Sequence, residues 1–336
     1  MANLSKDFAI PLRLINARGQ HLKNSFKGLL KNIESRAIEH KNNDKNVSSL
    51  VTWDDWLYAA FDCYSPNWKS GLNVGDPIPN HLIHNLPCPT GEIVSLGTWL
   101  LTKNIYRFKN EIAKELAKNE FEGKLPSFLI NISELCIYVQ TDNFDLYLEG
   151  SKVHGVIFTI TELCYKRVLV STVFLESGAA RTLVLLLSDG QTIEQCLNEF
   201  IKEFQDSRAV FSADELADYQ SLQKKLINIL LWFSLTDPDY SPLLPENHKE
   251  KNGIQKIKGQ PRLYEAEKYK PFIVGSAMAN HIRTFNSDLF EFNGVTSSNK
   301  RKAHLRRAHY HLYWLGPKGS YEQYEFKWIP VTMVSG

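Results

Sequence analysis

Three apolar runs decide the fold of this 336-residue chain: GVIFTITEL (residues 155–163), RVLVSTVFL (167–175) and RTLVLLLS (181–188). Each run is short and rich in β-branched residues, which favour strands. Only a few residues separate consecutive runs, too few for the crossover helix that parallel strands need. Together with the earlier runs SFLINI, LCIYVQ and FDLYLE, they predict a mainly antiparallel sheet over residues 126–188.

Helices are predicted on both sides of this sheet in the sequence. Before it, apolar residues at helical spacing predict a helix over 98–119. After it, Gly190 marks a turn, a helix begins near Thr192, and a longer helix runs over 212–235. These helices are amphipathic or apolar, so we expect them to form a layer that covers the sheet.

The remaining segments give weaker signals. A tryptophan-containing stripe predicts a helix over 53–64, and the proline-rich residues 65–91 favour a long loop or a boundary. Residues 240–262 are polar and basic and are expected to be a loop. A short strand ending at Gly275 is followed by a helix from Ser276.

The predicted fold class is therefore α+β, with N-terminal helices, a central mainly antiparallel sheet, a helical layer and a C-terminal β-hairpin. We expect an N-terminal helical and proline-rich region over residues 1–94 and a core over residues 95–336.

Composition limits the classes of function. The net charge is only +2, so any attraction to nucleic acid has to come from a local patch. The five cysteines are widely spaced and form no C-x-x-C pair, which favours a reduced, cytoplasmic setting without a disulfide framework. No segment is long and apolar enough to span a bilayer, so no membrane partner is expected. The sequence contains no P-loop, zinc-protease or nucleophile-elbow motif, and we expect neither catalysis nor a cofactor.

A basic and aromatic segment, RKAHLRRAHYHLYW (301–314), lies in a window without acidic residues between Glu291 and Glu322, and YEFKWIP (324–330) follows. These two runs predict a hairpin. Because side chains alternate along a strand, one face would be cationic and exposed. This face carries Arg307, His309, His311 and Tyr313. The opposite face of the hairpin would be aromatic and buried. This aromatic face carries Ala308, Tyr310, Leu312 and Trp314, with Tyr324, Phe326 and Trp328 from the second strand.

Four chemical uses of this segment can be compared. A metal site could use His309 and His311 with His304 or His281, but the adjacent arginines would repel the ion and no Cys, Asp or Glu is near in sequence. A nuclease could use two histidines as general acid and base, although their spacing is not distinctive.

The other two uses are binding. Five Lys or Arg residues within 300–307 could contact phosphates, while a cationic edge strand could equally capture an extended peptide. The residues alone do not rank nucleic acid against peptide.

The closing segments also carry a resemblance. HLRRAHYHLYWLG (304–316) and FKWIPVTMV (326–334) resemble the C-terminal signature of the type V-A anti-CRISPR family of mobile-element proteins. That signature reads R-R-G-H-W-H-x-Y-W-x-G and then W-x-P-x-x-x-V-N. Here Ala308 replaces the glycine, Tyr310 the first tryptophan and Ser335 the asparagine. Further matches, among them GTWLLTKNIYRFKNEI, LLWFSLTDPD and PFIVGSAMANHIRTF, occur in the same order from about residue 95 to the end.

The resemblance implies a function without catalysis. The family's inhibitor lowers synthesis of the type V-A CRISPR effector nuclease by recognising the N-terminal segment of the nascent chain, with loss of the effector mRNA. The expected partner is that peptide, with the ribosome or RNA close by, in the cytoplasm of a bacterial host cell. Our own inference from the motif gives the binding residues. They are Arg306, Arg307, His309, His311, Tyr313, Trp314 and Trp328. The rival is an RNA-binding protein or ribonuclease that acts directly on transcripts through the same hairpin.

Overall fold

The structure is a computed structural model. It describes residues 9–25, 28–43, 51, 55–56, 59, 88–118, 121, 124–132, 136–163, 166–206, 213–243, 253–292, 304–317 and 323–334. The first elements are α1 (Ala9–Ser25), α2 (Leu29–Asn43), α5 (Cys88–Leu100), β1 (Asn104–Phe108), α6 (Asn110–Lys118), a 3-10 turn (Ser127–Leu129), β2 (Ile137–Gln140), β3 (Tyr147–Leu148), β4 (Ser151–Leu163), β5 (Lys166–Leu175) and β6 (Ala180–Leu186). The later elements are α7 (Ile193–Asp206), α8 (Ala213–Phe233), β7 (Tyr240–Pro242), β8 (Ile254–Ile257), β9 (Gln260–Leu263), β10 (Lys270–Val274), α9 (Ser276–Phe292), β11 (His304–Arg306), β12 (His309–Leu315), β13 (Gln323–Ile329) and β14 (Thr332–Val334).

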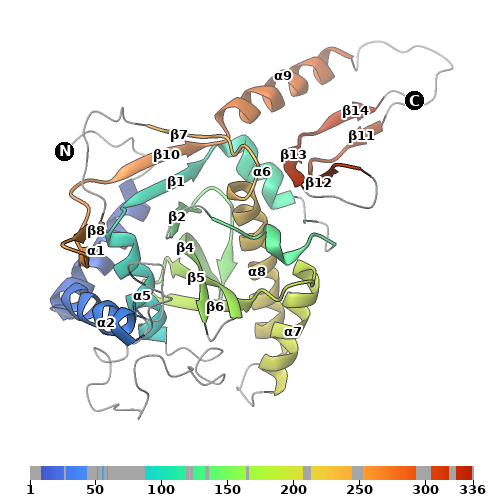
Figure 1. Cartoon of the computed structure of the whole chain (residues 1–336). Coiled ribbons are helices and arrows are strands. Elements are labelled where there is room, and N and C mark those ends of the chain that lie inside the picture. The colour runs from blue at the N-terminus through green and yellow to red at the C-terminus, as the bar shows by residue number, and fades with distance from the viewer. Residues whose placement is uncertain are drawn as a thin grey trace.

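A large sheet in the order β6-β5-β4-β2-β1-β10-β7 forms the centre of the molecule, with β3 paired to β4 (Figure 1). The strands β2, β4, β5 and β6 pair antiparallel, which confirms the sheet predicted over residues 126–188. At one side the sheet continues through β1, which pairs parallel with both β2 and β10. The fold is α+β, as predicted.

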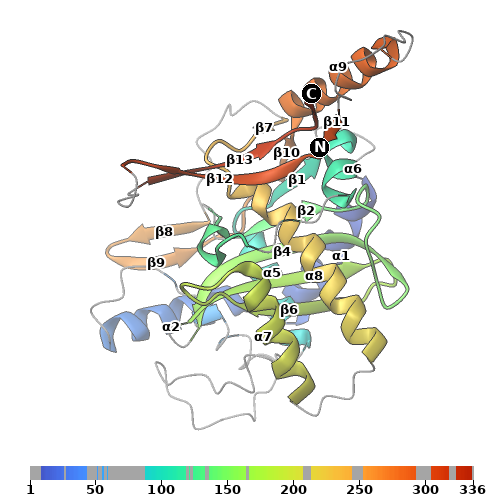
Figure 2. The same cartoon turned by 90° about the vertical axis from the view of Figure 1, so that its right-hand side faces the viewer.

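Each face of the sheet is covered by a different group of helices (Figures 1 and 2). On one face, α1, α2 and α5 form a core with Tyr138 and Ile157. On the other, α6, α7, α8 and the C-terminal strands form a core with Val139 and Phe158. Every residue of β2 is buried because alternate side chains enter opposite cores. None of the described helices is long and apolar enough to cross a bilayer.

The helix predicted over 98–119 was wrong, because the structure places α5, β1 and α6 there. The break falls at Lys103, whose backbone has a φ of 49° in the left-handed region that ends helices. Ile105 and Phe108 are buried in a central strand. Because a core covers each face of this strand, apolar residues can occur along it at any spacing. Their spacing happened to match a helix, and periodicity alone cannot distinguish a short buried strand from a helix.

Three smaller expectations were also wrong. The segment SFLINI forms a 3-10 turn over Ser127–Leu129 rather than a strand. Residues expected to be a loop within 240–262 include β7, β8 and β9. The part of the proline-rich stretch 65–91 before Cys88 lies outside the described residues, while its last residues are helical, because α5 begins at Cys88 with Pro89 in its first turn. Proline is tolerated there because the first backbone N–H groups of a helix have no intrahelical partner.

Other boundaries agree with the sequence. The helix α7 begins directly after Thr192, whose hydroxyl accepts from the N–H of Gln195 while the Gln195 side chain accepts from the N–H of Thr192, at 3.2 and 2.8 Å. The span of α8 matches the helix predicted over 212–235, and α9 begins at Ser276 as predicted. Of the helix expected over 53–64, only Asp55, Trp56 and Ala59 are described, and all three are buried. The rest of it lies outside the described residues.

Candidate functional site

The predicted C-terminal hairpin is present and consists of β12 and β13. In its register Tyr310 lies opposite Trp328, and Trp314 lies opposite Tyr324. Outside it, β11 pairs with β14, so that Arg306 lies opposite Thr332. The two aromatic sets therefore meet across the hairpin, as the alternation of the sequence predicted.

The inner face of the hairpin is part of the protein core. Tyr310 is 4% exposed and Trp328 is 5% exposed, and Phe326 is fully buried beside them. The Tyr310 ring stacks on Phe326 with centroids 5.4 Å apart, and Trp328 lies 5.2 Å from Trp232 of α8. Burial raises the pKa of the Tyr310 hydroxyl well above its ordinary value. Trp328 therefore supports the face rather than contacting solvent.

The outer face presents a row of cationic and aromatic side chains. Arg307 is exposed, His309 and His311 are half-buried, and Tyr313 is 41% exposed. The His311 and Tyr313 rings lie 4.2 Å apart, and the two histidine rings lie 6.1 Å apart. The structure thus brings together the rings of His309, His311 and Tyr313. Arg306 on β11 and Arg307 between β11 and β12 are both exposed just before this row.

Two contacts organise this outer face. Nδ1 of His309 lies 3.0 Å from the backbone carbonyl of Arg307. Because a carbonyl can only accept, Nδ1 of His309 is the donor in this contact, which orients the ring. On β13, Lys327 pairs with Glu325 at 2.5 Å, which raises the pKa of Lys327 through the hydrogen bond from its ammonium. The carboxylate of Glu325 is therefore neutralised on its own strand, and Arg307 leaves the face cationic.

Trp314 departs from the prediction of a wholly buried aromatic face. It lies on the same side as Tyr310, yet it is 47% exposed, and Tyr324 opposite is 43% exposed. The hairpin runs past the main body, so its far end extends beyond the helix that covers its base (Figure 2). Phe128 is an aromatic neighbour there, with centroid distances of 6.2 Å to Trp314 and 5.4 Å to Tyr324.

The histidines form no metal centre with their described neighbours. Within the part of the chain that the structure describes, no three His, Cys, Asp or Glu residues gather closely enough to hold an ion. His281 is exposed on α9, and the side chain of His304 lies outside the described residues.

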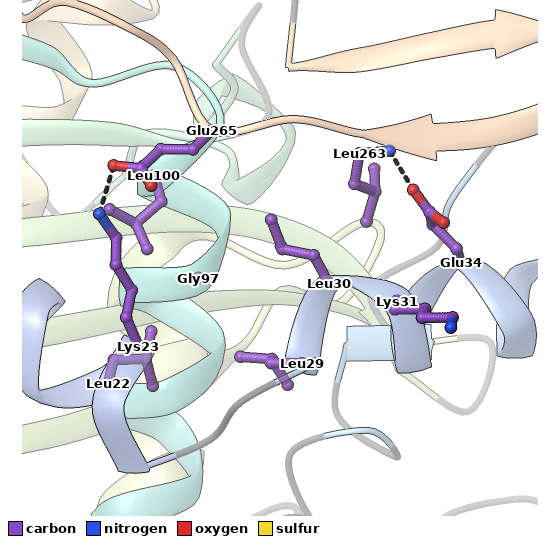
Figure 3. A pocket seen from close by; sticks show the side chains of 11 residues that line it. Leu22, Lys23, Leu29, Leu30, Lys31, Glu34, Gly97, Leu100, Leu263 and Glu265 are labelled. Carbon is purple, nitrogen blue, oxygen red and sulfur yellow. Dashed lines mark hydrogen bonds and ion pairs between the residues drawn. The ribbon is translucent and has the colours of Figure 1, made fainter.

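A cleft that sequence reasoning missed lies between α1, α2, α5 and the segment after β9 (Figure 3). Its volume is about 590 Å³, and leucines from four segments line it. They are Leu22, Leu29, Leu30, Leu100 and Leu263. These segments are far apart in sequence, so no local motif could have indicated the cleft. Its apolar lining can bury an apolar group.

The two carboxylates that line this cleft, Glu34 and Glu265, are both paired with cations. Glu265 accepts from Lys23 at 2.5 Å and from Lys103 at 2.6 Å. Burial alone would raise the pKa of Glu265, but the hydrogen bonds and charges of the two lysines outweigh it and lower the pKa overall. Glu34 accepts the backbone N–H of Leu263 at 2.6 Å and pairs with Arg262 at 3.0 Å. These contacts hold β9 against α2, and Glu265, which follows β9, against α1.

The fold and the site define an α+β protein with a cationic C-terminal hairpin, separate from the large sheet and anchored on the helix α8. By sequence, the chain belongs to the AcrVA2-like family, described as the anti-CRISPR type V subtype A2 family, whose model matches residues 106–336. The chain is also similar to the crystal structure of AcrVA2, with a TM-score of 0.59 and 18% identity over 96% of this chain and 99% of that chain. At that identity the likeness shows the fold alone. No curated protein matches the sequence.

The two comparisons cover different parts of the chain. The family model begins within β1, whereas the structural similarity extends over nearly the whole chain and so includes the N-terminal helices. The family match includes the complete C-terminal hairpin, as the resemblance noted in the sequence led us to expect.

Proposed function

We propose that this protein lowers the production of a type V-A CRISPR effector nuclease by recognising the N-terminal segment of the newly made effector chain. Recognition would lead to loss of the effector mRNA, without catalysis by this protein itself. Membership of the anti-CRISPR type V subtype A2 family supports the target class. The observation that carries the recognition step is the outer face of the hairpin, where exposed Arg307 and Tyr313 flank the two histidines.

The geometry of this face suits peptide recognition. A guanidinium such as that of Arg307 can form two parallel hydrogen bonds to a carboxylate, which gives direction as well as affinity. The rings of His311 and Tyr313 lie close enough together to present one continuous surface to a side chain. Because the inner face is fixed in the core through Tyr310 and Trp328, the outer residues are ordered before binding. Such preorganisation lowers the entropic cost of association.

A second function is favoured by one observation, namely two histidine rings 6.1 Å apart beside an exposed arginine. Two imidazoles can act as general acid and base, and a guanidinium can stabilise the charge that develops on phosphate. The alternative is therefore an RNA-binding protein or ribonuclease acting directly on transcripts.

Capture from a translating lysate tests the proposed function. The tagged protein is recovered from a lysate translating the effector, with and without RNase. Recovery of the effector's N-terminal peptide that resists RNase is the expected result. RNase-sensitive recovery of varied transcripts, with no effector peptide, would instead support direct action on RNA.

A ribosome-free assay tests the alternative. Purified protein is incubated with effector mRNA, beside His309→Ala, His311→Ala and, as a matched control on α9, His281→Ala. We expect the mRNA to stay intact with every form. Cleavage that is lost in the two hairpin variants and kept in His281→Ala would contradict a binding-only mechanism.

A further inference from the structure

The free end of the hairpin exposes large apolar side chains. Four of the eight exposed large hydrophobic residues in the described part of the chain lie there. They are Tyr313, Trp314, Leu315 and Tyr324. A cluster of this kind at the end of a projecting element is typical of an interaction surface. Figure 2 shows that this end of β12 and β13 extends past α8, and Phe128 is in ring contact with Trp314 and Tyr324 there.

The backbone of β13 shows which way the hydrogen-bonding groups of β12 point. The N–H of Phe326 donates to the hydroxyl of Thr236 at 2.9 Å, and its carbonyl accepts from the N–H of Thr236 at 3.0 Å. Both groups of Phe326 are therefore directed away from β12. Leu312, which lies opposite Phe326, is thus in a pair that shares no cross-strand hydrogen bonds.

Alternation along an antiparallel ladder extends this result to the neighbouring residues. If the pair at Leu312 shares no hydrogen bonds, the pair at Trp314 shares none either. Both residues then direct their backbone N–H and C=O groups to the outer edge of β12. Among the described strands, β12 pairs with β13 alone, so no described strand occupies this edge.

The edge also lacks the features that normally block edge strands. Proteins protect exposed edges with lysines, other charges, prolines or bulges. The strand β12 reads HYHLYWL, without Lys, Arg, Asp, Glu or Pro, and its register with β13 is regular over all seven residues. An edge of this composition is suited to accept another strand.

We propose that the outer edge of β12 binds an extended peptide, in which acidic residues alternate with apolar ones, by adding it to the hairpin as a third strand. Side chains on one face of the added strand would meet Arg307 and the histidines, which favours acidic residues. Those on the other face would lie beside Trp314, which favours apolar residues. The inference rests on the proposed function for the source of the peptide, a segment of the new effector chain.

A second copy of this protein fits the edge less well. Self-pairing would bring β12 against β12, and this strand contains no acidic residue to complement the cationic face. Charge complementarity therefore favours a peptide of different composition over a dimer formed through this edge.

Backbone methylation of a peptide tests the added strand directly. The probe is a synthetic peptide of alternating glutamate and valine, compared with two forms that are N-methylated at every glutamate or at every valine. Successive residues of a strand direct their N–H groups to opposite edges, so only one methylated form loses the bonds to β12. We expect the unmodified probe to bind and one methylated form, not both, to bind about tenfold or more weakly.

A pair of variants tests the edge from the side of the protein. Leu312→Pro removes the outward N–H but no bond to β13, and proline is tolerated on edge strands in that position. Leu312→Ala shortens the same side chain and keeps the N–H. We expect the proline variant to bind the probe at least about tenfold more weakly than the alanine variant, with both folded by thermal melting.

The outcomes separate this inference from the proposed function. No binding of the unmodified probe, or equal binding of both methylated forms, would overturn the added strand. So would a concentration-dependent dimer that Leu312→Pro abolishes, because a second copy would then occupy the edge. If the lysate experiment still recovers the effector's N-terminal peptide in any of these cases, the proposed function stands and only this edge is excluded.

Discussion

The hydroxyl of Tyr310 donates a hydrogen bond of 2.7 Å to the backbone carbonyl of Asn228. The side-chain amide of Asn228 in turn donates to the backbone carbonyl of Leu116 at 2.6 Å. These two bonds connect β12 to α8 and α8 to α6. The base of the hairpin is therefore fixed to the helical layer by polar contacts as well as by ring packing.

Replacing Tyr310 with phenylalanine tests this anchor. The ring packing is kept, and the carbonyl of Asn228 lies within α8 and keeps its helical partner, so only the additional hydrogen bond is lost. We expect Tyr310→Phe to lower the free energy of unfolding by about 0.5 to 1.5 kcal/mol in urea titrations. The exposed Tyr313→Phe serves as the control and should change the free energy by less than about 0.5 kcal/mol. Equal effects in both variants would show that the bond to Asn228 contributes nothing.

Charge reversal tests the role of Arg307. Its side chain is exposed, so Arg307→Glu should leave the melting temperature nearly unchanged while repression of the effector is lost, because acidic side chains would be repelled. The matched control is Lys202→Glu, which reverses an exposed cation on α7, away from the hairpin in both views (Figures 1 and 2). Effector levels in cells report the effect. Retained repression in Arg307→Glu would mean that this face is only structural.

Gly155 in β4 is required by a close approach of Tyr138. A Cβ atom at Gly155 would lie 2.4 Å from the Tyr138 hydroxyl and 2.5 Å from its ring. Tyr138 is fully buried and cannot easily move, so Gly155→Ala should cost about 1 to 3 kcal/mol of stability. At Gly19 in α1 a Cβ would meet only Leu100, at 3.5 Å, so Gly19→Ala should stabilise by up to about 1 kcal/mol. Denaturant unfolding distinguishes the two, and a neutral Gly155→Ala would contradict the packing described.

Acid should weaken the contact between Glu265 and the lysines at the rim of the cleft. The pKa of Glu265 is lowered from its ordinary value of 4.5, so its stabilising contribution is complete above that value and is lost as pH falls through the lower, folded pKa. Unfolding is compared between about pH 7 and about pH 3. Glu265→Gln should show a smaller acid-induced loss than the wild type, whereas exposed Glu267→Gln should behave like the wild type. An unchanged acid dependence in Glu265→Gln would exclude the contribution of this carboxylate.

The parts of the fold that could be predicted from sequence are those with a clear period. Alternation along residues 309–315 and 324–328 correctly predicted which side chains enter the core at the base of the hairpin. The long strands β4, β5 and β6 were equally clear because short connections require antiparallel pairing. The capping pair Thr192 and Gln195 confirmed the start of α7.

The parts that could not be predicted depend on contacts between distant segments. The strand β1 buries apolar side chains in two separate cores, Ile105 in one and Phe108 in the other, and the spacing of these residues therefore matched a helix. The exposure of Trp314 depends on how far the covering elements extend, which strand alternation does not encode. The contact between Thr236 and Phe326 joins residues 90 positions apart, so the direction of the β12 edge followed only from the structure.

The most direct test of the central claim is equilibrium binding of a labelled peptide, with the sequence of the effector's N-terminal segment, to the purified protein. The wild type and Lys202→Glu should bind it with equal affinity, and Arg307→Glu should bind at least about tenfold more weakly because a partly desolvated charge pair is replaced by repulsion. Equal affinity in all three proteins, or no binding by the wild type, would contradict recognition through the hairpin face.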